Sequence, residues 1–488
     1  MSETFYQHPD YAALLKVWKV AKDLYDGDHD TLVGADYLWR TENESSKLDG
    51  QRILGIRCQR TRYLNLSEVL VSLWKSIFFK QDPIYSARVQ QDLEQELKDV
   101  TGTGMSLTTY LKDSLLRDML LYGRSISLVN APFQIQRTTG GNQAIGFRPY
   151  LQNINPIAVP DWEVESTLGP NYGKFTQIRH EYDYLAPRKS LRDKPLITRR
   201  TTLFYLEGSK FAATTYQAVV EANGVLKQKE GQTVWTPVAD AFLSELKELP
   251  ISVLNDESWL KDANEENLRF FNLRSTLDSV NYYTGFPNRF LKGISSADAD
   301  LIKALTEYSW TLLPENGDAF SIEPPSATSL ENAVRESLAN VFKVGLNMLR
   351  SLPLDSGVAE AADTIKEQKA NTQALVLSTI ETLENKANEI VRFLGLYKGK
   401  TYDKEVTFSR DIVEEQVQEI LSLYSAIQDS IKKIPSWNKS VLKKFARRMN
   451  LPETDLDNIL TDIDNTDTTT QEQQNQTGTE DISTVING

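Results

Sequence analysis

Apolar and polar positions recur with a helical period within residues 102–132, between Leu107 and Leu120. The apolar positions are Leu107, Leu111, Leu115, Met119 and Leu120, and the charged residues between them are Lys112, Asp113, Arg117 and Asp118. This spacing predicts one amphipathic helix with a single apolar stripe facing a core. Ser106 is the expected N-cap and Gly123 the expected stop, and residues 125–129 predict a strand that leaves the helix.

The rest of the first half mixes helical and strand patterns. Residues 11–25 and 60–80 carry apolar side chains at helical spacing, and a break at Gly27 follows the first of these segments. Residues 148–162 contain three prolines among short apolar runs. Alternating patterns at 175–184, 201–206 and 216–220 predict antiparallel strands, with turns at Gly140-Gly141 and Asn223-Gly224. The first half is therefore expected to be α+β.

The pattern becomes mainly helical after about residue 250. Helices are predicted at 264–283, at 328–350 and, after a loop of helix-breaking residues at 351–357, over about 359–393. A small mixed segment, 288–325, lies between the first two helices. A strand at 405–408 and two helices at 412–434 and 436–449 follow, and residues 466–488 are too polar to fold alone.

Composition restricts the class of protein. The 488 residues are 40% apolar and 25% charged, which suits a folded protein of two or more domains. No run of about 18 apolar residues predicts a membrane span, no signal peptide is apparent, and Cys58 is the single cysteine. A net charge of −13 argues against a protein that coats DNA, but it is compatible with a surface past which DNA slides.

No motif for catalysis or for a cofactor stands out. His8, His29 and His180 lie in no context of an activated nucleophile, and no phosphate-binding loop of the ATPase type is present. Gly102 and Gly104 lack the third glycine of a dinucleotide site and are interpreted as a plain turn. The acidic residues of 23–30 do not follow calcium-loop spacing and are expected to form a solvated loop. We therefore expect no enzyme, no cofactor and no metal site, with a metal-dependent nuclease as the alternative.

Several separated stretches together resemble one family, the bacteriophage portal proteins, in a branch long catalogued only as a domain of unknown function. They are Tyr11 and Trp18 with DLYDG at 23–27, RTRYLN and IFFKQDP within 60–83, GTGMSL to LYGRSISLVNAP at 102–132, and RPYLQNINP with PDW within 148–162. The order of helix, insert, helix, breaker loop and long helix in the second half agrees with that family.

The resemblance implies an α+β, mainly helical portal fold with wing, stem, clip and crown regions. The wing would comprise residues 1–260, the first stem helix 261–286, the clip 287–326 and the second stem helix 327–351. The tunnel loop would be 352–362, the long helix and a wing strand 363–411, the crown 412–465, and a disordered polar tail 466–488.

The implied function is a ring of about twelve copies at one capsid vertex, a conduit for double-stranded DNA during packaging and ejection. Implied partners are the terminase large subunit, a head-to-tail adaptor, and the major capsid protein or scaffold, with no membrane. The expected location is the virion, after assembly in the host cytoplasm. Another structural capsid or tail component is the alternative.

The resemblance also suggests residues for each role. Candidate DNA-channel residues are Lys343, Arg350, Lys366 and Lys369, each with a salt bridge as its alternative role. The tunnel loop includes Leu352, Pro353, Leu354 and Asp355, which would otherwise be a simple helix connection. Candidate clip contacts are Asn288, Arg289, Trp310, Glu315 and Asp318. A basic patch of the crown, at Lys432, Lys433, Lys439, Lys443, Lys444, Arg447 and Arg448, would contact either DNA or protein.

Overall fold

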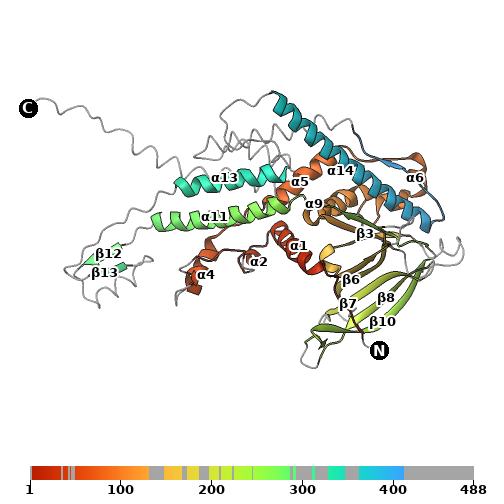
Figure 1. The fold of residues 1–488 in the computed structure, drawn as a ribbon, viewed down its shortest axis with the longest axis horizontal. Coiled ribbons are helices and arrows are strands. Elements are labelled where there is room, and N and C mark those ends of the chain that lie inside the picture. The colour runs from red at the N-terminus through yellow and green to blue at the C-terminus, as the bar shows by residue number, and fades with distance from the viewer. Residues whose placement is uncertain are drawn as a thin grey trace, which may run out of the picture.

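The computed structural model of the chain describes residues 3–34, 37–41, 44–45, 50–130, 148–166, 173–185, 197–207, 210–221, 225–244, 246–285, 289–292, 310–313, 328–346 and 362–410. Figure 1 shows an α/β body at one end, with two long helices that lie side by side and leave it toward the other end. Helices and strands are both abundant, so the expected α+β class is confirmed.

The largest sheet is antiparallel and has seven strands. Its order is β1–β10–β8–β7–β6–β5, and β9 pairs with β10. The bounds are β1 Glu3–Thr4, β5 Asp161–Val164, β6 Phe175–Leu185, β7 Ile197–Glu207, β8 Lys210–Ala218, β9 Gln228–Lys229 and β10 Gln232–Ser244. Threonine and aromatic residues, which suit a pleated, half-buried surface, are frequent in β6 to β8.

A second, three-stranded sheet lies at the centre of the body, in the order β11–β3–β4. Helices pack around it, and their apolar side chains join one large core with those of β3 and α14. The strands are β3 Arg124–Asn130, β4 Tyr150–Ile154 and β11 Ile251–Asn255. The helices include α1 Tyr11–Asp26, α5 Leu66–Phe78, α8 Leu107–Tyr110, the π-helical segment η1 Leu111–Leu116, α9 Arg117–Tyr122 and α14 Ala362–Tyr397.

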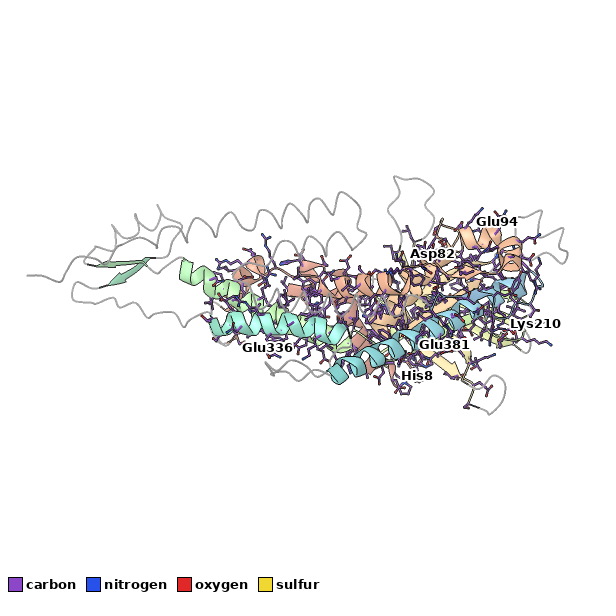
Figure 2. All side chains as sticks on the ribbon, turned by 90° about the horizontal axis from the view of Figure 1, so that it is seen from above. His8, Asp82, Glu94, Lys210, Glu336 and Glu381 are labelled. Carbon is purple, nitrogen blue, oxygen red and sulfur yellow. The ribbon has the colours of Figure 1, made fainter. Side chains whose placement is uncertain are left out.

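The remaining elements are shorter, except for the two helices of the projecting pair. That pair is α11 Lys261–Gly285 and α13 Thr328–Gly345, with β12 Arg289–Lys292 and β13 Trp310–Leu313 between them in the sequence. The short elements are α2 His29–Gly34, α4 Gly50–Arg60, β2 Ile84–Tyr85, α6 Ala87–Asp92, α7 Glu94–Lys98, the 3₁₀ turn η2 Pro156–Ala158 and β14 Val406–Thr407. Side chains cover the body densely, and Figure 2 shows α13 and α14 from above.

Most long elements agree with the sequence prediction. Helices at 11–25, 264–283, 328–350 and 359–393 correspond to α1, α11, α13 and α14, and the strand at 405–408 corresponds to β14. Ser106 accepts a hydrogen bond from the Thr109 amide as the expected N-cap, and Gly123 ends α9 with a left-handed backbone at φ 65°. These predictions are confirmed. The periodicity of α1 and α13 and the residue types of the two caps explain why those could be recognised.

Two predictions for the first half are wrong in their bounds. The helix predicted over 60–80 begins only at Leu66, because the Asn65 side chain caps it by accepting from the Glu68 amide. Residues 50–60 form a separate helix, α4. The strand predicted at 216–220 runs instead over 210–218 as β8, and β10 and β11 were not predicted.

The helix of the 102–132 stretch is also less simple than its spacing suggests. Its middle turn, η1, is π-helical, which inserts an extra residue and shifts the following positions around the axis. Asp118, expected on a polar face, is consequently fully buried at 0% exposure, while all five predicted apolar positions are buried as expected. Of the four charged positions of the predicted helix, only Asp118 is therefore buried, whereas Lys112, Asp113 and Arg117 are half-buried.

Candidate functional site

The α11–α13 pair is the most distinctive feature of the described chain. Figure 1 shows that α11 leaves the body and α13 returns to it, with β12 and β13 beyond their far end. The two strands pair in parallel, with Arg289 opposite Trp310 and Lys292 opposite Leu313. We call α11, β12, β13 and α13 the hairpin.

Buried amide side chains hold the first half of α11 against the body. Asn264 and Asn267 are 3% and 1% exposed. Ser67 Oγ on α5 donates to Asn264 Oδ1 at 2.7 Å, and Asn267 Nδ2 donates to Ser67 Oγ at 3.1 Å and to Tyr63 Oη at 2.8 Å. Because a buried amide is costly without partners, these bonds favour one register of α11 on α5.

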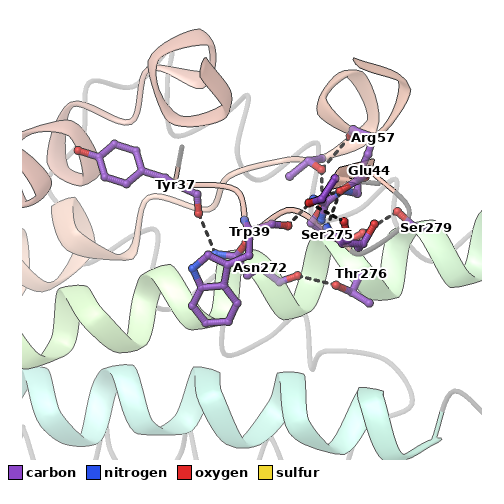
Figure 3. A network of polar contacts seen from close by, with 11 residues as sticks. Tyr37, Trp39, Glu44, Arg57, Asn272, Ser275, Thr276 and Ser279 are labelled. Carbon is purple, nitrogen blue, oxygen red and sulfur yellow. Dashed lines mark hydrogen bonds and ion pairs between the residues drawn. The ribbon is translucent and has the colours of Figure 1, made fainter. Parts of the chain in front are cut away.

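One turn further, Asn272 holds the segment that connects α2 with α4 (Figure 3). Its Nδ2 donates to the Tyr37 carbonyl oxygen at 2.9 Å, and its Oδ1 accepts from the Trp39 amide at 2.6 Å. The oxygen and the nitrogen of the Asn272 side chain thus each bond the backbone, one on either side of Leu38. Leu38 is itself buried at 3% exposure.

An ion pair closes the same network. Arg57 on α4 lies 2.8 Å from Glu44 Oε2, and their side chains are only 7% and 2% exposed. Arg57 also donates to the Trp39 carbonyl oxygen, and the Thr41 amide donates to Glu44 at 2.8 Å. Removing one partner of such a pair leaves a buried charge uncompensated, so the network ties α4 firmly to the segment beside α11.

The return helix, α13, is fixed at its body end by a close approach to α5. The Trp74 indole N–H donates to the Gly345 carbonyl oxygen at 2.9 Å. A Cβ atom on Gly345 would lie 2.4 Å from Leu70 Cδ1, so a larger residue at this position would require the buried Leu70 side chain to move. Ser337 Oγ donates to the Glu266 carbonyl oxygen at 3.3 Å, which ties α13 to α11 directly.

The far halves of both helices are much less covered. No residue of α13 from Thr328 to Glu336 is buried, whereas Ser337 and Leu338 are. On α11, residues 276–281 are half-buried or exposed although Leu277 and Val280 are among them. A half-covered pair of helices is suited to further packing along its sides.

The candidate DNA-channel residues differ in where they lie. Lys343 is on α13 and is only 5% exposed in the single chain. Lys366 and Lys369 lie in the first turns of α14. Arg350 is outside the described residues.

The other candidate residues are mostly outside the described part of the chain. Arg289 and Trp310 begin β12 and β13 and face each other in the register of that pair. The clip candidates Asn288, Glu315 and Asp318, the tunnel loop 352–361 and the crown and tail from 411 onward lie outside the described residues. Sequence reasoning missed the buried network of Asn264, Asn267, Asn272, Arg57 and Glu44.

The glycine turn before α8 is filled by the chain itself. Asp99 accepts from the Gly104 amide at 2.8 Å and pairs with Arg148 at 2.7 Å. The Arg148 hydrogen bond, followed by that amide, lowers the pKa of Asp99. A carboxylate occupies the position that a bound phosphate would need, which agrees with a structural turn.

Asp118 and Arg117 form a buried pair in the same unit. Arg117 lies 2.8 Å from Asp118 Oδ1, and Asn153 Nδ2 donates to Asp118 Oδ2 at 2.8 Å. Burial raises the pKa of Asp118, and Arg117 and the Asn153 hydrogen bond oppose the rise. Asp118 is fully buried and the Arg117 side chain is 31% exposed, so the pair lies at the edge of the core, where its contact with Asn153 holds α9 against β4.

A cavity of about 200 Å³ lies where β6 and β7 meet β11 and α14. Glu248 lines it and binds both Arg392 of α14 and Lys174 before β6, the latter at 3.1 Å. Burial disfavours the ionised form of Glu248, but Arg392 and Lys174 outweigh it and lower the pKa. Glu248 pairs with Arg392 and Lys174, and Lys386 pairs with Glu389, so these charges of the lining neutralise one another.

The solvated loop expected for the acidic residues of 23–30 is found only in part, because Asp26, Asp28 and Asp30 are exposed but Asp23 is buried and most of the segment is helical. Asp23 and Asp26 lie on α1, where Asp23 accepts a hydrogen bond from Tyr37 Oη at 2.8 Å. Asp28 lies just before α2 and accepts a hydrogen bond from the Thr31 amide of that helix. Within the described ranges, no three His, Cys, Asp or Glu side chains converge to hold a metal ion. Nor does any described helix combine the length and apolar character needed to cross a membrane.

Comparison of the sequence with protein-family models and with curated proteins found no match.

Proposed function

We propose that this chain is a bacteriophage portal protein, a subunit of a ring of about twelve copies through which double-stranded DNA passes. The observation that carries the proposal is the hairpin. A helix leaves an α/β body, a small strand pair follows, a second helix returns, and a long helix, α14, then crosses the body (Figure 1). This is the order of stem, clip, stem and long helix that the sequence resemblance implies.

The uneven burial of the hairpin supports a role in a ring. The far halves of α11 and α13 leave apolar side chains half-covered, including Leu277, Val280 and Leu330. In a closed ring, each hairpin would lie between two others, and neighbouring copies would bury these sides. The end that carries β12 and β13 would then be presented to the terminase and to the head-to-tail adaptor.

The charge of the chain is compatible with a conduit. A net charge of −13 for each copy is multiplied around a ring, so the summed field opposes tight capture of phosphate. Weak repulsion lets DNA slide, whereas a basic wall would hold it. In this proposal the protein performs no catalysis, and a separate terminase supplies the energy for packaging.

The decisive test is the assembly state of the purified chain. Mass photometry and negative-stain images are expected to give closed rings of about twelve copies of the 55.3 kDa subunit, each with a central channel. A stable monomer or an open filament would contradict the proposal. Divalent-metal-dependent cleavage of DNA by the purified protein would favour the nuclease alternative instead.

A second experiment separates the ring from its docking end. A variant with residues 289–313 replaced by a short Gly-Ser linker is expected to form rings but to lose binding to the terminase large subunit of the same phage. Loss of the rings themselves would show that this segment is needed for assembly rather than for docking.

A further inference from the structure

Arg124 is held against the body of the protein by aromatic rings rather than by an acidic partner. It is half-buried at the start of β3. Its guanidinium carbon lies 4.3 Å from the centre of the Trp162 ring and 5.5 Å from that of the Trp18 ring. Its Nε donates to Asn255 Oδ1 at 2.6 Å. One edge of the guanidinium is thus fixed by the chain itself.

The other edge of the guanidinium has no partner in the described part of the chain. The terminal nitrogens of Arg124, Nη1 and Nη2, have no hydrogen-bond acceptor there, and neither is fully enclosed. By contrast, Arg57, Arg117 and Arg392 each lie beside a glutamate or aspartate. Burial lowers the pKa of Arg124 to about 10, and the nearby charge of Asp10 opposes that effect. The guanidinium has therefore lost part of its hydration without gaining an ion pair.

The two tryptophans that hold Arg124 are themselves fixed. Trp18 and Trp162 are only 2% and 7% exposed, and the Trp18 indole N–H donates to the Tyr122 carbonyl oxygen at 2.8 Å. The His8 imidazole stacks on Trp162, with 4.0 Å between the ring centres. A planar guanidinium that is stacked on fixed rings and bonded through Nε has little rotational freedom left. Little conformational entropy is therefore lost when its outer nitrogens bind a ligand.

The geometry of the free edge and the charges around it indicate which ligand suits the site. The outer edge of a guanidinium offers two parallel N–H donors, which carboxylate and phosphate groups accept in bidentate form. The charge of Asp10 acts on Arg124, and Asp256 and Glu257, which follow Asn255 in the chain, are exposed. These negative charges repel a doubly charged phosphate more strongly than a singly charged carboxylate. The surroundings therefore favour a carboxylate.

We propose that Arg124 is a preformed binding site for a carboxylate group, which the outer nitrogens of its guanidinium hold in bidentate form. The carboxylate belongs either to a second copy of this chain or to a free carboxylic acid, and both present the same chemistry to the guanidinium. The proposal does not depend on the proposed ring, because the groups that form the site all belong to one chain.

The first test is a titration of the full chain with sodium acetate at about pH 7, in which acetate replaces chloride at constant ionic strength. The tryptophan fluorescence is expected to change with half-saturation at about 10 mM acetate. The melting temperature is expected to rise by about 1–3 °C at about 200 mM acetate. Arg124→Lys keeps the charge but not the planar fork, and it is expected to bind acetate at least about tenfold more weakly.

The Arg124→Met variant separates a binding role from a structural one. Methionine keeps an apolar stem against Trp18 and Trp162 but removes the desolvated charge. In chloride, this variant is expected to melt at the wild-type temperature or above it, and in acetate it is expected to lack the shift of the wild type. No response of the wild type to acetate would overturn the proposal. A lower melting temperature of Arg124→Met in chloride would then assign Arg124 a structural role.

Arg88→Met is the matched control. The Arg88 guanidinium also lies over an aromatic ring, 5.2 Å from the centre of Tyr402, but it is exposed and helps to lower the pKa of the nearby Asp92. Because its charge already has an acidic neighbour, this variant is expected to respond to acetate as the wild type does. An equal loss of the response in both methionine variants would assign it to the general charge of the chain and overturn the site.

The assembly state distinguishes the two sources of the carboxylate. For a carboxylate of a second copy, mass photometry is expected to show several-fold weaker self-association of Arg124→Met, and of the wild type in about 200 mM acetate. For a free carboxylic acid, self-association is expected to stay unchanged in both cases, while Arg124→Met still fails to bind acetate. A wild-type chain that binds acetate at Arg124 but forms no rings would contradict the portal proposal and retain this site.

Discussion

The Trp74 indole donates its N–H to the carbonyl oxygen of Gly345, and this bond joins two residues 271 positions apart in the sequence. It places the end of α13 so close to α5 that a side chain at 345 would require Leu70 to move. Gly345→Ala would bring a Cβ atom to 2.4 Å from Leu70 Cδ1. We expect a loss of about 1–3 kcal/mol in the free energy of unfolding, measured by urea denaturation followed by tryptophan fluorescence.

The control for this prediction changes the opposing side chain. Leu70→Val removes the Cδ atoms that a new methyl group would meet. The double variant is therefore expected to be more stable than the sum of the two single losses predicts. Strict additivity would mean that the clash with Leu70 is not the cause.

The Asn272→Ala variant tests the network beside α11. It leaves the Trp39 amide and the Tyr37 carbonyl without their partner, and we expect unfolding to become about 2–4 kcal/mol more favourable. Asn281→Ala, on the exposed far part of the same helix, is the matched control and is expected to change stability by less than about 0.5 kcal/mol. Equal effects of the two substitutions would argue that helix propensity, not the network, determines the loss.

The buried His180 predicts a loss of stability in mild acid. Burial lowers its pKa from 6.5 to about 4, so the unfolded chain binds a proton between these values and the folded chain does not. The free energy of unfolding is therefore unaffected by His180 above pH 6.5. It decreases by about 3 kcal/mol as the pH falls from 6.5 toward 4. Unfolding of His180→Phe, which keeps an aromatic contact with Tyr182, is expected to depend less on pH in this window.

Tyr182→Phe is the control for that measurement, because it keeps the ring that stacks on His180 and leaves the imidazole in place. The loss of stability in mild acid is expected to persist in this variant. A His180→Phe profile as steep as that of the wild type would locate the acid sensitivity in other groups.

The ion pairs of Glu248 connect α14 with the residue before β6, and we expect their contribution to stability to depend on salt. In Glu248→Gln, the ion pairs with Arg392 and Lys174 are lost, and amide exchange in β11 and the last turns of α14 is expected to accelerate several-fold. The difference from the wild type should shrink at about 0.5 M salt. Because the pKa of Glu248 is lowered, its contribution is present above the ordinary value of 4.5 and is lost as the pH falls through the folded value.

An exposed pair gives the comparison. Glu94 and Lys98 lie on the surface of α7 at 2.7 Å, with side chains 65% and 74% exposed. Glu94→Gln is expected to leave exchange in α14 unchanged, since exposed pairs contribute little to stability. Faster exchange in both variants would point to a general effect of charge.

The long helices were predictable because periodicity over many residues averages out local exceptions. α1, α13 and α14 have apolar side chains on one face, and Ser106 and Gly123 have the residue types that caps require. β10 was missed because register shifts after Pro237 and after Phe242 break its alternation, and β11 was missed because it has only five residues.

The network beside α11 could not be predicted from the sequence for a different reason. Asn264, Asn267 and Asn272 recur on one helix in the manner of a solvent-facing side, and only their partners on distant segments make them a buried set. Asp118 was predicted to be polar and exposed because the residue types around it do not indicate the π-helical turn that precedes it. The repeated asparagines of α11 were the one feature of the sequence that could have indicated a buried polar network.

Both helices of the hairpin are attached to the same short helix of the body. Ser67 of α5 bonds Asn264 at the start of α11, and Trp74 of α5 bonds Gly345 at the end of α13. The 25 residues of α11 make an arm of roughly 37 Å, and α5 with its 13 residues is its pivot. A sideways push at the strand pair would therefore reach the body as a torque on α5, and the two helices would tilt together rather than slide past each other.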